Sequence, residues 1–441
     1  MPDLPLSVFW FRRDLRLEDN AGLWQALQSG KPVLPIFIFD RDILDSLPKP
    51  YDARVDFLHQ TLRALKAKLR AIGTDLWVYY DQPRAVFQQL TQQYSVEAVF
   101  TNRDYEPYAK ARDGQISDLL RDKGITFAHF KDQCIFEHTE VRTGQGGVYG
   151  VFTPYSRRWK ALLAEQGLPH YDTEPLWAHF LKITAEVNPP PLPFLEEMGF
   201  APTNQHFPPA SLPEKIVRVY DQQRNFPARP GTTRLSIHLR FGTVSIREMV
   251  RQAQILNQTW LNELIWRDFY MMILDYYPQL INTSYRPEYD QITWRNNEAE
   301  FAAWCEGKTG YPIVDAGMRE LNKTGFMHNR VRMITASFLT KHLLVDWRWG
   351  ERYFAQKLLD FELSSNNGGW QWAAGSGTDA APYFRIFNPE AQTKKFDPDL
   401  QYIKKWVPEF QSLSYKPIVD HAFARQRCLD TYQKALKKQA E

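Results

Sequence analysis

The spacing of hydrophobic residues differs between the two halves of the chain. Between residues 6 and 130, short apolar runs rich in β-branched and aromatic residues read LSVFWF, VLPIFIF, TDLWVYY and VEAVFTN. Amphipathic segments such as VDFLHQTLRALKAKLRAIG separate them, with apolar residues three and four positions apart. Strands that alternate with helices in this way indicate a parallel sheet covered by helices. We therefore predict a Rossmann-like α/β domain with a five-stranded parallel sheet over residues 1–130.

This predicted domain lacks the usual signature of dinucleotide binding. No GxGxxG sequence follows the first predicted strand, although that fingerprint places a pyrophosphate at a helix N-terminus in many α/β domains. The domain therefore need not bind a nucleotide, and its fold alone does not disclose its role.

The spacing of hydrophobic residues changes twice beyond residue 130. Residues 131–213 become irregular and rich in proline, with the runs NPPPLPF and FPPASLP, which predicts a long connector over the surface. Residues 214–441 follow helical spacing in segments such as WLNELIWRDFYMMILDYY and NRVRMITASFLTKHLLVDWRWGERYFAQKLLD. This spacing predicts a second domain that is all-α.

Composition narrows the class of protein. A chain of 441 residues exceeds a single hydrophobic core. A hydrophobic content of 44%, a charged content of 24% and a mean hydropathy of -0.48 are typical of a globular protein and exclude a membrane span. The formal net charge of +3 says little about nucleic acid.

Cysteine usage points to a reducing compartment. Cys134, Cys305 and Cys428 are too few and too widely spaced for a disulfide framework, a CxxC metal pair or an iron–sulfur centre. We therefore expect a cytoplasmic protein without a metal site.

The segment NNGGWQWAAGSGTDAAPYFRIFNP, residues 366–389, concentrates two indoles, several amides and a glycine-rich turn. On a helix, Trp370 and Trp372 point about 200° apart, so one can face the core while the other opens toward a cavity. Asn366 falls one turn before Trp370 on the same side. For the tryptophan pair alone, a buried aromatic helix ended by glycines is the simpler interpretation.

A second group brings an acid beside two indoles. On a helix, Trp260, Glu263 and Arg267 share a face, with Trp266 at its edge. A solvated glutamate with tryptophans turned to the core explains this segment equally well.

Two further groups carry possible binding chemistry. In MHNRVRM, Asn329 and Met333 stack one turn apart, although a capping asparagine with surface arginines also suffices. Tyr220, Arg224 and the run GTTRLS at residues 231–236 precede a predicted helix and suit a pyrophosphate. Ordinary N-caps are the alternative interpretation of that run.

These segments, together with SVFWFRRDLRLEDN, NRDYEP and KFDPDLQYIKKWVPE, resemble the photolyase and cryptochrome flavoproteins over nearly the whole chain. The runs WLNELIWRDFY, EGKTGYPIVDAGMREL and NNGGWQWAAGSGTDAAPYFRIFNP are similar to the flavin domain of class I cyclobutane pyrimidine dimer photolyases. The resemblance implies a deoxyribodipyrimidine photo-lyase, in which photoexcited reduced anionic FAD passes an electron to a pyrimidine dimer flipped out of DNA. The implied partner is UV-damaged DNA, single or double stranded, and we expect a monomer that binds no membrane.

The resemblance also implies a role for individual positions. The FAD-binding residues would be Tyr220, Thr232, Thr233, Arg234, Leu235, Ser236, Trp260, Arg267, Asn329, Arg332, Asp360, Glu362 and Asn366. The catalytic residues would be Glu263, Asn329, Met333 and Asn366, with Asn366 facing flavin N5. The DNA-binding residues would be Arg224, Glu263, Trp266, Asn329, Arg330, Met333 and Trp372. An electron relay would run from the surface inward through Trp294, Trp347 and Trp370.

Elementary chemistry agrees with these assignments. A reduced anionic flavin requires a cationic neighbour, which Arg332 paired with Asp360 can supply. The carbonyl that accepts the electron requires a hydrogen-bond donor, and Glu263 can serve if it is protonated. Burial against Trp260 and Trp266 raises the pKa of a carboxyl in that direction.

Within the family, particular residues favour repair over signalling. His328 stands alone where the (6-4) enzymes carry a histidine pair, and Asn366 stands where plant cryptochromes have an acid and animal cryptochromes a cysteine. The alternative function is a cryptochrome-type blue-light receptor that signals to a protein partner. A dark flavin oxidoreductase is disfavoured because nothing resembles a nicotinamide site.

Three residues depart from the pattern of close relatives, namely Phe326, Phe361 and Glu362. Glu362 replaces one acid by another, so we expect its contact on the flavin side to be kept. The run NRDYEP at residues 102–107 does not decide the antenna chromophore, which stays open among methenyltetrahydrofolate, an 8-hydroxy-deazaflavin, a flavin nucleotide and none.

Overall fold

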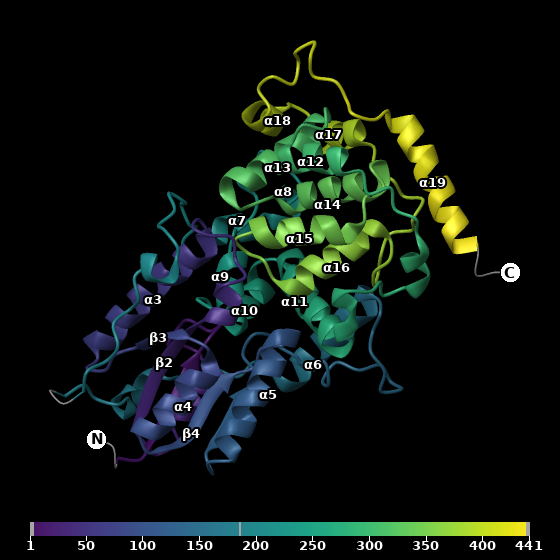
Figure 1. Ribbon diagram of the computed structural model, residues 1–441. Coiled ribbons are helices and arrows are strands. Elements are labelled where there is room, and N and C mark those ends of the chain that lie inside the picture. Colours follow the sequence, from purple (N-terminus) through teal and green to yellow (C-terminus); the bar gives the residue numbers. More distant parts are fainter. Residues whose placement is uncertain (1–3, 185–186, 438–441) are drawn as a thin grey trace. The chain divides into compact units, whose positions relative to one another are not determined.

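The computed structural model describes residues 4–184 and 187–437, and the chain divides into two compact units (Figure 1). The first unit comprises residues 1–137, 162–212 and 234–252, and the second comprises residues 138–161, 213–233 and 253–441. Two of the boundaries fall inside helices, α6 (Phe152–Gln166) and α10 (Ile246–Leu256).

The first unit is built on a parallel sheet of five strands in the order β3-β2-β1-β4-β5. The strands are β1 (Leu6–Phe11), β2 (Val33–Asp40), β3 (Trp77–Asp81), β4 (Val96–Asn102) and β5 (Thr126–Phe130). All four strand pairings are parallel. The predicted α/β fold with a five-stranded parallel sheet is confirmed.

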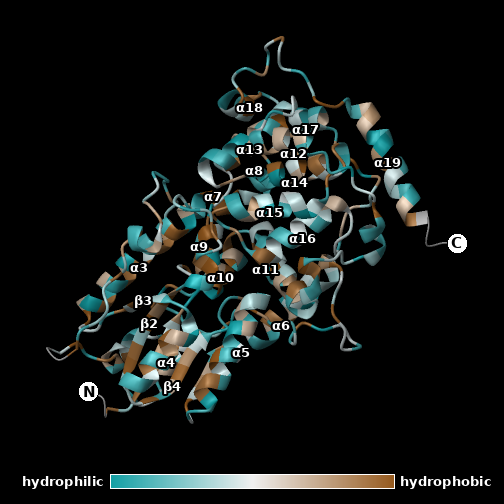
Figure 2. Ribbon diagram, viewed as in Figure 1, coloured by the Kyte–Doolittle hydropathy of each residue, from teal (hydrophilic) through white to brown (hydrophobic). Residues whose placement is uncertain are grey.

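Both faces of this sheet are buried under helices. In β1, Phe9 and Phe11 enter one core, whereas Val8 and Trp10 enter the other. Side chains of α1 (Ala21–Leu27) and α3 (Ala53–Ala71) complete the first core, and those of α4 (Pro83–Gln93) and α5 (Pro107–Arg121) complete the second. Strands covered on both faces read as continuous apolar runs, and Figure 2 accordingly shows largely hydrophobic strands beside the two-coloured helix α3. The remaining short helices of this unit are α2 (Arg41–Leu44), η1 (Glu174–His179), η2 (Glu196–Met198) and α9 (Ser236–Phe241).

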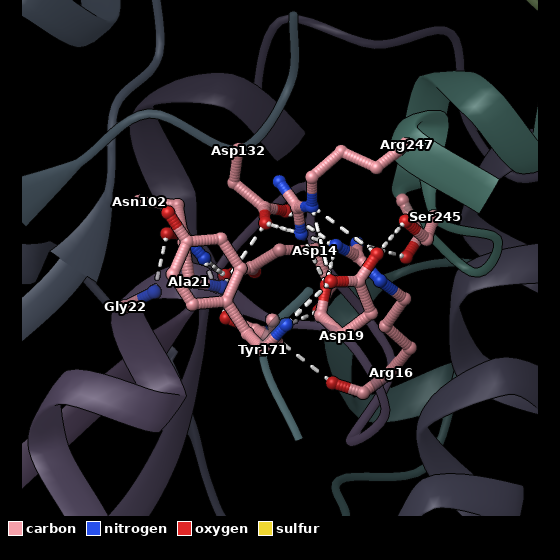
Figure 3. A network of polar contacts seen from close by, with 12 residues as sticks. Asp14, Arg16, Asp19, Ala21, Gly22, Asn102, Asp132, Tyr171, Ser245 and Arg247 are labelled. Atoms are coloured by element: carbon pink, nitrogen blue, oxygen red, sulfur yellow. Dashed lines mark hydrogen bonds and ion pairs between the residues drawn. The ribbon is translucent and has the colours of Figure 1, made fainter. Parts of the chain in front are cut away.

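A buried ion-pair network ties α10 to the carboxyl-terminal edge of the sheet (Figure 3). Arg16, which follows β1, donates to Asp132 at 2.7 Å. Arg247 of α10 donates to Asp132 at 2.8 Å and to Asp19 at 3.1 Å. These four side chains are 1–6% exposed. Two guanidinium groups balance two carboxylates, which offsets much of the desolvation cost of burying them.

The second unit is all-α, as predicted. Its longer helices are α11 (Gln258–Tyr276), α12 (Glu298–Glu306), α13 (Pro312–Thr324), α14 (Asn329–Ser337), α15 (Trp347–Lys357), α16 (Leu363–Ala374), α17 (Pro389–Phe396) and α19 (His421–Lys437). Its shorter ones are α7 (Glu214–Arg218), α8 (Tyr220–Gln223), η3 (Pro278–Ile281), η4 (Pro287–Gln291), the π-helical turn η5 (Phe338–His342) and α18 (Gln401–Trp406). One large core, which includes Trp304, Trp347 and Trp370, joins α12 to α16.

Two glycines allow α16 to pack closely against its neighbours. A Cβ added to Gly350 of α15 would lie 2.1 Å from the ring of Trp370, and one added to Gly368 would lie 2.2 Å from the ring of Tyr270 in α11. Both distances are far below van der Waals contact, so neither position accepts a larger residue without moving a helix. Helix α16 is therefore held rigidly between α15 and α11.

Among its described residues, the stretch expected to be an irregular connector, residues 131–213, contains one α-helix, α6. Tyr155 and Trp159 of this helix are fully buried, and Trp159 donates a hydrogen bond to Asp268 at 3.0 Å. The proline-rich composition on its C-terminal side concealed this short amphipathic segment.

In the described part of the chain, no helix is both long enough and apolar enough to cross a lipid bilayer.

Candidate active site

Helix α11 carries two ion pairs one turn apart. Its start is fixed by Asn257, whose side chain accepts the first free backbone N–H groups of the helix. Arg267 pairs with Glu362 at 3.1 Å, and both side chains are more than 90% buried. Glu263, four residues earlier, forms a short ion pair with Arg224. One helical face therefore holds a cation toward one partner and an anion toward another.

The indoles on α11 lie in different surroundings. Trp260 is buried, whereas Trp266 is partly exposed and stacks on Phe152 with 3.8 Å between ring centroids and 4° between planes. The simple interpretation of core tryptophans beside a solvated glutamate fits Trp260 only. Glu263 keeps 28% of its side chain exposed, but it is ion-paired.

The surroundings of Glu263 act on its carboxyl in opposite directions. Burial raises the pKa of Glu263, and the guanidinium of Arg224 acts against that rise. Arg224 also lies over the ring of Tyr220, 5.3 Å from its centroid. Burial and the repulsion of Arg224 lower the pKa of Arg330, so the two guanidinium groups are close enough to repel each other. Two cations and one anion thus share this part of the second unit.

Helix α14 starts with a cap other than Asn329. The imidazole of His328 accepts the backbone N–H of Arg330 at 3.1 Å, which leaves Asn329 as an exposed first residue of the helix. Met333 lies one turn later and is partly exposed. Arg330 donates to the side chain of Asn225 at 2.7 Å. A capping role therefore does not explain Asn329.

A third ion pair joins α14 to the loop before α16. The guanidinium of Arg332 donates to both carboxylate oxygens of Asp360, at 2.9 and 3.0 Å, and to the carbonyl of Met327 at 2.8 Å. The Asp360 side chain is 9% exposed and that of Arg332 is 26% exposed. This geometry fixes a positive charge at a defined place.

Asn366 has a partner that sequence reasoning missed. Its side-chain amide donates to the carbonyl of Glu351 at 3.0 Å and to the Glu351 carboxylate at 2.8 Å. Both amide hydrogens are thus directed to α15, and the amide oxygen remains as the acceptor. The sequence offers no signal for this contact, because a separation of 15 residues that spans two helices follows no local spacing rule.

The tryptophans assigned to the relay lie in one aromatic core. Trp347 and Trp370 are 1% and 2% exposed, and the partly exposed Trp294 packs against the same core. Trp372 is partly exposed and lies 6.5 Å from Phe387 between ring centroids. The indoles of Trp370 and Trp372 therefore differ in burial, as their helical spacing predicts.

The run at residues 231–236 crosses a unit boundary along the chain, between Thr233 and Arg234. In the second unit, Thr232 and Thr233 are partly exposed and Tyr220 is buried, which raises the pKa of its phenol. In the first unit, Arg234 has a φ of 54° and Leu235 precedes α9 without a side-chain cap. The exposed Ser236 is the first residue of α9. The ordinary N-cap interpretation is therefore wrong for this run.

The donor set of the second unit fits a flavin dinucleotide. Arg332 and Arg267 present guanidinium groups held by acids, Asn366 presents an amide oxygen, and Thr232 and Thr233 present hydroxyls. Fixed cations suit an anionic flavin and a pyrophosphate, and a fixed acceptor suits a ring N–H.

The comparisons with known proteins agree with this assignment. Residues 260–421 match the family described as FAD binding domain of DNA photolyase, and residues 7–174 match the family described as DNA photolyase. The deoxyribodipyrimidine photo-lyase of Synechococcus sp. is 40% identical over 93% of this chain and 90% of its own length.

Two solved structures are similar over nearly the whole chain. A bacterial class III photolyase from Agrobacterium tumefaciens has a TM-score of 0.85 at 34% identity, over 99% of this chain and 98% of its own. An archaeal photolyase from Sulfolobus tokodaii, solved with two FAD molecules, has a TM-score of 0.85 at 34% identity, over 98% of this chain and 100% of its own. Fold and site thus define a flavin-binding protein with an α/β and an all-α part. The chain belongs to the DNA photolyase family.

Proposed function

We propose that this protein is a deoxyribodipyrimidine photo-lyase that splits cyclobutane pyrimidine dimers in UV-damaged DNA under light. The observation that carries the proposal is the pairing on α11. One helical turn links Arg267, on the side assigned to the flavin, to Glu263, on the side assigned to the lesion. A rigid helix that contacts both cofactor and substrate sets their relative position.

On the cofactor side, the protein supplies charge and orientation. Bound FAD provides a light-driven transfer of one electron. Arg332, held by Asp360, places a positive charge that favours the reduced anionic form of a flavin. Asn366, oriented by Glu351, offers its amide oxygen to a ring N–H.

On the substrate side, the protein supplies an aromatic wall for the extruded base, a hydrogen-bond donor for the dimer and contacts to the DNA backbone. Trp266, stacked on Phe152, offers a rigid apolar face for an extruded base, and Trp372 offers a second one. Extrusion costs a few kcal/mol, and less for a damaged base. Glu263, Asn329 and Met333 contact the dimer, with Glu263 donating a hydrogen bond to a pyrimidine carbonyl.

Electrons for reactivation reach the cofactor through Trp294, Trp347 and Trp370. Trp294 is partly exposed, whereas Trp347 and Trp370 are buried, which suits a path from the surface to the interior. We assign the enzyme to class I because the runs around α11, α14 and α16 resemble that class. We also propose a monomer in the cytoplasm, where three free cysteines are stable.

The test is a repair assay with protein reduced in the dark and an oligonucleotide that carries one thymine dimer. Illumination should restore the two thymines. Replacing Glu263 with Ala should reduce the repair yield while DNA affinity changes little, because the lost group acts on the reacting carbonyl. Intact dimers after illumination of reduced wild-type protein would instead favour a cryptochrome-type receptor.

A further inference from the structure

The roles assigned to Arg224 and Glu263 exclude each other in the arrangement observed. A carboxylate that pairs with a guanidinium is ionised and accepts hydrogen bonds, so it cannot donate one to a pyrimidine carbonyl. The guanidinium of Arg224 donates to the Glu263 carboxylate, which offsets its charge and weakens its attraction for a DNA phosphate. Arg224 and Glu263 occupy each other in this way.

The groups around Glu263 determine its charge once this pair separates. In the described part of the chain, Arg224 is the cation that contacts the carboxyl, and the charge of Glu263 also acts on Tyr220 and Tyr270. Burial raises the pKa of both phenols, so each stays neutral. With Arg224 gone, burial is the remaining influence on the pKa of Glu263, and burial favours the protonated carboxyl.

Arg224 has a reason to exchange its partner for a phosphate. Arg330 lies close enough to repel Arg224, and its guanidinium donates to the amide oxygen of Asn225, which carries no charge. A DNA phosphate can bind a guanidinium in bidentate fashion and can neutralise both cations together. The Arg224 and Glu263 side chains are 24% and 28% exposed, so the pair is accessible to such a competitor.

We propose that Arg224 and Glu263 separate when damaged DNA binds. A backbone phosphate takes Arg224, and the released Glu263 takes up one proton from solvent and donates it in a hydrogen bond to the dimer. Release of the product reverses the exchange and returns the proton. This inference rests on the proposed function and adds that lesion binding itself prepares the acid. Arg224 is then a positioning residue that keeps Glu263 ionised until a substrate arrives.

The exchange predicts proton uptake on binding, which calorimetry detects. The FAD-loaded protein is titrated in the dark with a dimer-bearing oligonucleotide, near neutral pH, in buffers of different ionisation enthalpy. Wild-type protein should take up about one proton for each oligonucleotide bound. Glu263→Gln, which keeps the shape of the side chain, should bind DNA with no uptake. Arg224→Gln should also show no proton uptake, because without the guanidinium the Glu263 carboxyl is already protonated before DNA binds.

A matched control separates this exchange from a general loss of charge. Arg218 and Glu214 form an exposed pair of the same chemistry at 3.1 Å, so Arg218→Gln should keep the full uptake. Infrared spectra provide a second readout, since the C=O band of a protonated carboxyl should appear with DNA in wild-type protein and without DNA in Arg224→Gln.

Two outcomes would overturn the exchange. One is uptake that persists in Glu263→Gln, and the other is tight binding by wild-type protein without uptake. The repair assay on the same samples distinguishes the two proposals. Ring splitting without uptake removes the exchange alone, whereas uptake without ring splitting removes the proposed repair function and leaves the exchange.

Discussion

Asn366 and Glu351 are joined by two hydrogen bonds between adjacent helices. The amide nitrogen of Asn366 donates to the main-chain carbonyl of Glu351 at 3.0 Å and to its carboxylate at 2.8 Å. Burial raises the pKa of the Glu351 carboxyl, and the bond from Asn366 acts against that rise. Glu351 therefore decides which end of the amide faces away from α15, although it is not among the residues expected to contact the cofactor.

Replacing Glu351 with Ala should lower the reduction potential of the bound flavin. Without the carboxylate the Asn366 amide keeps only its bond to the main-chain carbonyl of residue 351, so the acceptor for the ring N–H is held less firmly. A hydrogen bond of this kind contributes about 1 kcal/mol, which corresponds to about 40 mV for a one-electron couple. A spectroscopic redox titration measures the shift. Glu351→Gln keeps an acceptor oxygen and should stay close to wild type; an equal shift in both variants would contradict the orienting role.

Replacing Trp370 with Phe should separate reactivation from repair. Photoreduction of oxidised flavin should slow strongly, because the proposed relay loses the buried indole assigned as its last electron donor. Repair by chemically reduced protein should persist. The smaller ring leaves a gap against Gly350 and should cost about 1–2 kcal/mol of stability. Transient absorption measures the first effect, and Trp349→Phe, in the same helix as Trp347, is the control. Equal loss of photoreduction and repair would refute the relay assignment.

Replacing Arg330 with Ala should weaken DNA binding more than catalysis. If Arg330 contacts one phosphate, the slope of log affinity against log salt should decrease in magnitude by about 1. Binding measured by fluorescence anisotropy at several salt concentrations tests this, with Arg218→Ala as an exposed control. The guanidinium also lies over Phe396, 4.3 Å from its centroid, so thermal unfolding should be measured in parallel. An unchanged slope would exclude the phosphate contact.

The fold was predictable because hydrophobic residues are spaced differently along the two units. Both faces of the sheet are buried, so its strands stand out as apolar runs, and the second unit follows helical spacing nearly throughout. Helix α6 was not predicted, because this one short amphipathic segment adjoins a proline-rich stretch. The spacing of hydrophobic residues predicts secondary structure well over a long series of elements and poorly for a single short helix.

The same limit applies to the site. Glu263 and Arg267 share a face of α11, and helical spacing alone placed them together. The partners across elements are a different matter. Arg224 lies 39 residues from Glu263, and Phe152 stacks on Trp266 from a helix that the sequence did not reveal. Such contacts depend on tertiary packing, so the separation along the chain carries no signal for them.

A pair of histidines makes the docking of α19 sensitive to acid. His342 of η5 is 1% exposed, and its Nε2 lies 2.8 Å from Nδ1 of His421, at the start of α19. Burial, together with the neighbouring His421 and Arg427, lowers the pKa of His342 to about 3. The phenol of Tyr311 also packs beside the ring, 6.0 Å away between centroids. Protonation of His342 is therefore strongly disfavoured in the folded protein.

Acidification should accordingly destabilise the second unit. Below pH 6.5, the ordinary pKa of a histidine in the unfolded chain, His342 is protonated in the unfolded state but stays neutral in the folded state. The contribution of His342 to the free energy of unfolding is therefore complete above pH 6.5 and decreases as the pH falls toward about 3. The loss should approach about 1.4 kcal/mol for each pH unit in that window. Thermal unfolding from pH 7 to pH 4 measures it. His342→Gln keeps a neutral hydrogen-bonding group toward His421 and should flatten the dependence; an unchanged profile in this variant would assign the acid sensitivity to other groups.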